Sequence, residues 1–65
     1  MIVQQRIAQY LVQKGIKQKF LCDKTGIKQV KMSNLMNARI ELSADDFELI
    51  CKALGEKPDQ FIHID

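Results

Sequence analysis

The segment QKFLCDKTGIKQVKMSNLMNA, from Gln18 to Ala38, is the most informative part of the chain about its architecture. Apolar residues recur with helical spacing on both sides of Gly26, a residue that readily ends a helix in the left-handed conformation. The segment after Gly26 also carries amide and ammonium groups along one face, namely Lys28, Gln29, Lys31 and Asn34. The stretch therefore predicts two short helices joined by a tight turn, the second with a polar and basic face.

Helical periodicity also precedes this stretch. One apolar stripe comprises Val3, Ile7, Tyr10 and Leu11. We expect a first helix over about Ile2–Lys14, which Gly15 should end. The second helix should start near Lys17 or Gln18 and bury its apolar side, and the third should run over about Lys28–Met36.

The C-terminal part predicts a fourth helix and a short fifth one. Ser43 can cap the fourth helix, since two aspartates follow it in the first turn, where negative charge is favourable. The apolar stripe of this helix comprises Phe47, Ile50, Cys51 and Leu54. Pro58 suits the first turn of a fifth helix over Pro58–Ile62. Its apolar residues, Phe61 and Ile62, should fold back over the core.

Composition favours a single all-α domain spanning residues 1–65. A chain of this length buries only a small core, and a compact bundle of five short helices fits it well. No apolar run approaches the roughly twenty residues that cross a bilayer. The N-terminal residues also lack the sections of a signal peptide. We therefore expect a cytoplasmic protein that does not associate with membranes.

The cysteines and the single histidine predict no chemistry. Cys22 and Cys51 lie within apolar helical patterns, so buried free thiols are expected, and His63 is far from both in sequence. These residues and the scattered acids provide neither a zinc site nor a nucleophile paired with a base. We expect no enzymatic activity, no cofactor, no metal and no small-molecule ligand.

Charge divides the chain into two unlike parts. Residues 1–39 carry eight Lys and Arg against Asp23 alone, a net +7, whereas residues 40–65 carry two lysines against seven acids, a net −5. Six of the eight N-terminal cations fall between Lys14 and Lys31. Lysines can simply solvate a surface, but so one-sided a distribution favours a polyanionic partner for the first part.

The sequence also resembles a known family. The residues that carry the resemblance are Gln18, Cys22, Gly26, Ile27, Met32, Ser33, Leu35 and Asn37, followed by Ser43, Phe47, Ile50, Leu54 and Gly55. Over about Val3–Ile62 they resemble the Cro/CI-type helix-turn-helix of phage repressors and bacterial regulators, the lambda-repressor-like or XRE-like group. The resemblance implies a five-helix domain that binds double-stranded DNA as a homodimer on a palindromic operator. The implied function is a transcriptional regulator, a repressor or Cro-like protein, associated with the nucleoid, with residues 28–36 in the major groove.

The same resemblance assigns the site residues. The positions that face base edges correspond to Gln29, Val30 and Asn34, with Lys31 beside them. The positions that contact phosphate correspond to Lys17, Gln18, Lys28 and Arg39. Amide side chains can pair with adenine, and an apolar side chain can lie against a thymine methyl group.

Three departures from the family pattern are informative. Serine or threonine is common before helices two and three, where this chain has Lys17 and Lys28. A cation there opposes the helix dipole unless a phosphate lies between it and the helix N-terminus. Ala38 replaces a glycine, so the left-handed residue should be Asn37 instead. Many relatives have an ion pair at the positions of Leu11 and Met36, so we expect these two side chains to be in contact.

Other functions stay open. A protein-binding adaptor, or an antirepressor-like module without operator recognition, would be favoured if Phe20, Val30 and Ile40 formed one exposed apolar patch. Phe20 could instead lean on a neighbouring helix, which is the favoured interpretation. RNA binding is disfavoured because the few aromatic residues offer no stacking platform. By resemblance alone, a dimer interface is expected near Arg39–Leu42 and Phe61–Asp65.

Overall fold

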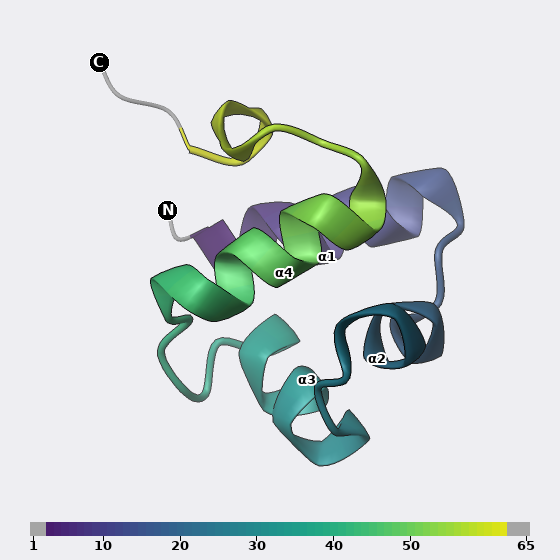
Figure 1. Cartoon of the computed structure of the whole chain (residues 1–65), viewed down its shortest axis with the longest axis vertical. Coiled ribbons are helices and arrows are strands. Elements are labelled where there is room, and N and C mark those ends of the chain that lie inside the picture. The colour runs from purple at the N-terminus through teal and green to yellow at the C-terminus, as the bar shows by residue number, and fades with distance from the viewer. Residues whose placement is uncertain (1–2, 63–65) are drawn as a thin grey trace.

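The computed structural model describes residues 3–62, which form four α-helices and one 3₁₀ turn (Figure 1). The elements are α1 (Val3–Lys14), α2 (Gln18–Thr25), α3 (Gln29–Met36), α4 (Ala44–Leu54) and the turn η1 (Pro58–Gln60). The α-helices begin and end within about a residue of the predicted bounds, and the predicted start at Ile2 lies outside the described residues. The count of five helices is wrong. Within residues 3–62 the chain has four.

The segment after Pro58 is a single tight turn for a structural reason. The N–H groups of Phe61 and Ile62 both donate to the Pro58 carbonyl, at 3.0 and 3.2 Å. The turn ends at Phe61, whose ring is buried in the core and only 1% exposed. Of the two apolar residues expected to fold back, only Phe61 does so, because Ile62 is 37% exposed.

The helix ends follow from local sequence. Gly26 adopts a φ of 79°, and its N–H donates to the Cys22 carbonyl at 2.9 Å, closing α2 in the left-handed conformation. Ser43 caps α4, because its Oγ accepts a hydrogen bond of 3.1 Å from the Asp46 N–H. Both ends were predicted from these residues.

A single core holds the helices together. The α3 helix packs on α1 and α2, while α4 packs on α2 and on the C-terminal turn. Six side chains are fully buried: Ile7, Leu21, Met32, Leu35, Ile50 and Phe61. Four predicted core residues lie at its edge and are only partly buried: Val3, Cys22, Phe47 and Leu54. The thiol of Cys51 is buried, and burial raises its pKa, so it behaves as an apolar side chain.

The α1 helix binds the C-terminal turn with aromatic and polar contacts. Phe61 meets the edge of Tyr10 with ring centroids 5.3 Å apart and that of Phe47 at 6.4 Å. Arg6 donates to the Phe61 carbonyl at 2.9 Å, and the Tyr10 hydroxyl donates to Glu56 at 2.7 Å. The hydrogen bond to Glu56 raises the pKa of Tyr10. These contacts fix the last described residues on α1.

The connection between α3 and α4 differs from the prediction. Asn37 has a φ of −93°, whereas Ala38 is in the left-handed region with a φ of 58°. The Asn37 side chain donates to the Ser33 carbonyl at 2.9 Å, so Asn37 keeps a helix-like backbone. The left-handed residue therefore falls one position later, at the position for which the resemblance implies glycine. The connection is also bonded to α1, since the buried Gln4 amide donates to the Ile40 carbonyl at 2.9 Å.

No helix among residues 3–62 is long and apolar enough to span a membrane.

Replacing Met36 by glutamate should destabilise the domain strongly. Leu11 and Met36 are 4% and 5% exposed within the same core, and a direct contact between them stays a prediction. An unpaired carboxylate at this site should lower the free energy of unfolding by about 3 kcal/mol or more. Thermal denaturation followed by circular dichroism measures the effect. Met36→Leu is the control and should cost less than about 1.5 kcal/mol. A near-wild-type melting temperature for Met36→Glu would contradict the apolar contact.

Replacing Ala38 by glycine should stabilise the domain. A non-glycine residue in the left-handed region costs roughly 1–2 kcal/mol, and glycine avoids most of this strain. A gain of about 1 kcal/mol corresponds to a rise of roughly 4–8 °C in melting temperature. Ala8→Gly, in the middle of α1, is the control and should lower the melting temperature, because glycine weakens a helix interior. A fall with Ala38→Gly as well would show that the left-handed backbone carries no strain.

Candidate nucleic-acid interface

The core leaves one side of α3 free for solvent. Met32, Leu35 and Met36 of this helix are buried, whereas Gln29 is exposed and Val30 is 76% exposed. At 3.6 residues per turn, Asn34 lies about 40° around the helix from Val30. Val30 and the half-buried Asn34 therefore lie on the side opposite the core, whereas exposed Gln29 lies about 100° around the helix from Val30, at the border of that side.

The α2 and α3 helices begin in the same unusual way. Lys17 and Lys28 occupy the position before each helix, with extended backbones (ψ of 148° and 151°). An ammonium group has no acceptor, so neither side chain caps the N–H groups of the first turn. Each lysine also places a positive charge at the positive end of a helix dipole. Ser43 does cap α4, whereas the 3₁₀ turn also begins after an uncapped lysine, Lys57.

This geometry creates two sites that suit anions. A helix N-terminus with free N–H groups and a cation beside it attracts phosphate or carboxylate oxygens. Gln18 is exposed at the first position of α2, next to Lys17, and Gln29 occupies the equivalent position beside Lys28. Three of the four residues predicted to contact phosphate, Lys17, Gln18 and Lys28, thus lie at the N-termini of α2 and α3.

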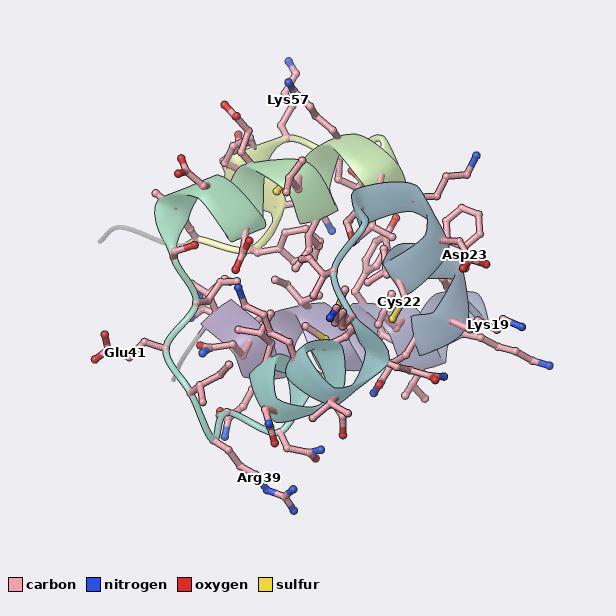
Figure 2. The ribbon with its side chains drawn as sticks, turned by 60° about the horizontal axis from the view of Figure 1, so that its bottom comes forward. Lys19, Cys22, Asp23, Arg39, Glu41 and Lys57 are labelled. Carbon is pink, nitrogen blue, oxygen red and sulfur yellow. The ribbon has the colours of Figure 1, made fainter. Side chains whose placement is uncertain are left out.

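Arg39 extends the basic region past the C-terminal end of α3. Its side chain is exposed and projects outward from the connection, at the opposite edge of the view from Lys57 (Figure 2). The Arg39 N–H donates to the Asn34 carbonyl at 2.9 Å, which fixes its backbone against the end of α3. The side chain is therefore anchored at its base and free at its tip.

Lys31 makes a contact that sequence reasoning missed. Its Nζ lies 3.0 Å from Oδ2 of Asp46, in the first turn of α4. Asp46 was interpreted from the sequence only as a favourable charge at a helix start. An acid so placed beside a basic helix could have signalled the pair, but only with knowledge of how α3 packs near α4. The predicted role of Lys31 at base edges stays a prediction, and in this structure its ammonium group is engaged with α4.

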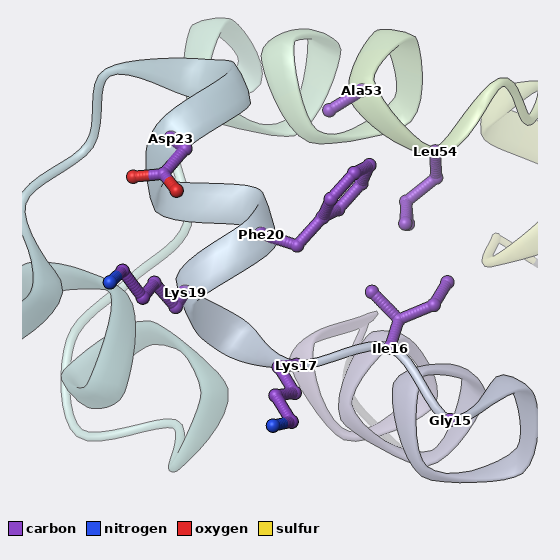
Figure 3. A pocket seen from close by; sticks show the side chains of 8 residues that line it. All are labelled: Gly15, Ile16, Lys17, Lys19, Phe20, Asp23, Ala53 and Leu54. Carbon is purple, nitrogen blue, oxygen red and sulfur yellow. The ribbon is translucent and has the colours of Figure 1, made fainter.

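A shallow apolar hollow lies beside α2, away from the residues of α3. It measures about 600 Å³ and is open to solvent, and the Phe20 ring points toward Ala53 and Leu54 of α4 (Figure 3). Phe20 therefore leans on a neighbouring helix, as the favoured interpretation had it, while staying 42% exposed with Lys24 over its ring at 5.7 Å. Val30 and Ile40 are exposed but do not line the hollow.

Comparison with known proteins gave one informative match. A family model described as the Cro/C1-type HTH DNA-binding domain matches residues 6–65. That span includes all four α-helices except the first three residues of α1. Comparisons with curated proteins and with solved structures gave no significant match.

Replacing Lys28 by serine should stabilise the isolated domain. Serine at this position accepts a hydrogen bond from the first turn of α3, and the substitution also removes a charge that opposes the dipole. A good cap contributes about 1 kcal/mol to the free energy of unfolding, which urea denaturation can resolve. Lys57→Ser, before the short 3₁₀ turn, is the control with a smaller expected gain. A loss of stability with Lys28→Ser would show that the lysine contributes a favourable contact in the free protein.

Proposed function

The chain belongs to the family of Cro/C1-type helix-turn-helix DNA-binding domains, and from that premise we propose that it is a sequence-specific transcriptional regulator. In this proposal α3 enters the major groove of double-stranded DNA, and the protein acts as a repressor or a Cro-like competitor. Its place would be the cytoplasm, on the nucleoid.

The observation that carries the proposal is the pair of lysine-led helix starts. Because lysines precede α2 and α3, neither helix has a side-chain cap, and this lowers the stability of the free protein. A phosphate oxygen at each N-terminus would accept hydrogen bonds from the free N–H groups and would also neutralise the lysine. The unfavourable arrangement in the free domain therefore becomes favourable on DNA.

Phosphate contacts would place the domain on the duplex. The proposed set comprises Lys17, Gln18, Lys28 and Arg39, all of them exposed. The excess of cations in residues 1–39 supports it, because neutralised phosphates supply most of the charge-driven affinity.

Base contacts would then carry the sequence information. Gln29 and Asn34 can each pair with adenine N6 and N7, and Val30 can contact a thymine methyl group. A bidentate amide contact discriminates against the wrong base by about 1–3 kcal/mol. Lys31 is left out of this set because Asp46 binds its ammonium group.

We further propose a homodimer on a palindromic operator. The expected interface includes Arg39–Leu42 and Phe61–Asp65, of which residues 63–65 lie outside the described range. Ile40 and Ile62 are 39% and 37% exposed, which supports an apolar contact in this region. Half-sites about one helical turn apart should then be protected together.

A protein-binding adaptor is the second candidate, and the hollow at Phe20 is the observation that favours it. The adaptor function does not require Lys17 or Lys28 before the helices. Weak, salt-independent binding to any DNA would favour the adaptor over the regulator.

Binding measured over a series of salt concentrations tests the regulator, with genomic fragments and a random duplex as ligands. Lys28→Ser should reduce the steepness of log K against log salt by about 0.9 on every sequence, although the variant is the more stable protein. Lys57→Ser is the matched control, because it also removes a lysine before a helical turn, yet on the side away from Arg39. It should leave the slope nearly unchanged. Equal effects of the two substitutions would contradict a phosphate contact at α3.

Gln29→Ala tests base reading in the same assay. The slope should stay as in the wild type, while preference at one base pair falls by about 1–3 kcal/mol. An equal loss of affinity for selected and random DNA would contradict the assignment of Gln29 to a base edge.

A further inference from the structure

We propose that Asp46 withholds Lys31 from DNA and so limits the charge-driven affinity of the domain for duplexes of any sequence. This inference rests on the proposed function, because it concerns a residue that tunes the same interface. It assigns to the first turn of α4 a role that goes beyond helix capping.

The Asp46 carboxylate is held in place more firmly than a surface acid. Its backbone N–H donates to Ser43 Oγ, which fixes the first turn of α4. Its side chain is only 15% exposed, so it has little room to move away from α3. The Lys31 side chain is 52% exposed and supplies the mobile partner of the pair. The lysine therefore reaches toward a stationary acid on the next helix.

Lys31 lies where its charge would otherwise affect DNA binding. It follows Val30 by one residue, which places it about 100° around α3 from the centre of the exposed face. A lysine side chain at the border of that face is long enough to swing toward a phosphate or toward α4. The 3.0 Å contact shows the second position in the free protein.

The consequence can be expressed through counterion release. Each phosphate that a protein cation neutralises makes log K against log salt steeper by about 0.9, which corresponds to about eightfold in affinity at 0.1 M salt. When Lys31 pairs with Asp46, this contribution is lost unless the pair breaks. Since the contribution would be equal for all sequences, the pair lowers affinity for random DNA without weakening the contacts of Gln29 or Asn34.

Asp45 provides a matched control within the same helical turn. Both aspartates lie in the first turn of α4, so each favours the helix dipole in the same way. Asp45 is exposed and forms no ion pair with any residue of the described range 3–62. Substituting either aspartate by asparagine removes one negative charge, but only Asp46→Asn releases Lys31.

The experiment measures binding of the full chain to a random 20-base-pair duplex between 50 and 300 mM salt, for four variants and the wild type. Asp46→Asn should steepen the salt dependence by about 0.9 and raise affinity by up to about eightfold at 0.1 M salt. Asp45→Asn should change the slope by less than half as much. In a Lys31→Gln background, Asp46→Asn should lose most of its effect, since no lysine remains to be released.

Each outcome distinguishes the inference from the proposed function. Equal slope changes for Asp46→Asn with and without Lys31 would overturn the inference, because Asp46 would then act through its charge alone. Wild-type slopes for Asp46→Asn would overturn it as well, while leaving DNA binding intact. An absence of salt-dependent binding by the wild-type chain would instead contradict the proposed function, and the inference with it.

Discussion

The structure depends on the burial of one side of α3. A helix of eight residues is too short to persist alone in water, where about 12–15 residues are needed for even marginal stability. Its start lacks a cap and carries Lys28, which weakens it further. The contacts of Met32, Leu35 and Met36 with the core therefore supply the stability that the helix itself does not have. The same contacts determine which residues α3 presents to solvent.

The α1 helix provides the frame for that core. The Gln4 side chain donates a hydrogen bond to the connection after α3. Arg6 donates to the Phe61 carbonyl, and the Tyr10 hydroxyl donates to Glu56. Each of these side chains replaces a contact with water by a hydrogen bond to a distant part of the chain, at a net gain of about 1 kcal/mol. Their combined effect is to hold the connection after α3 and the C-terminal turn against the same helix, α1.

Much of this architecture could be predicted from the sequence because its causes are local. Gly26 ends α2 and Ser43 starts α4 through interactions with residues at most four positions away. The apolar stripes identified most of the buried residues for the same reason. Such features depend on helical geometry alone, which periodicity reports directly.

The expectations that failed have one local cause and two tertiary ones. Whether Asn37 or Ala38 becomes left-handed depends on the hydrogen bond from the Asn37 side-chain amide to the Ser33 carbonyl. Either residue could adopt the left-handed backbone conformation. The short turn ends at Phe61, whose ring contacts Tyr10 and Phe47, and these contacts depend on tertiary packing. The pairing of Lys31 with Asp46 requires that α3 pack near α4, and the spacing of residues in the sequence does not reveal that packing. At the candidate interface, the exposure of Gln29 and Val30 could therefore be predicted, whereas the pairing of Lys31 with another helix could not.

The sequence separation between α1 and the partners of its hydrogen bonds also indicates the order in which the domain should fold. The partners of Gln4, Arg6 and Tyr10 lie 36, 55 and 46 positions further along the chain, so these are the hydrogen bonds of longest sequence separation within residues 3–62. The turn between α2 and α3 needs only local contacts and can form early. The hydrogen bonds of α1 join residues far apart in sequence, so the entropic cost of closing those loops delays their formation. Docking of α1 would therefore come late in folding, and the exposed face of α3 would acquire its final orientation only at that step.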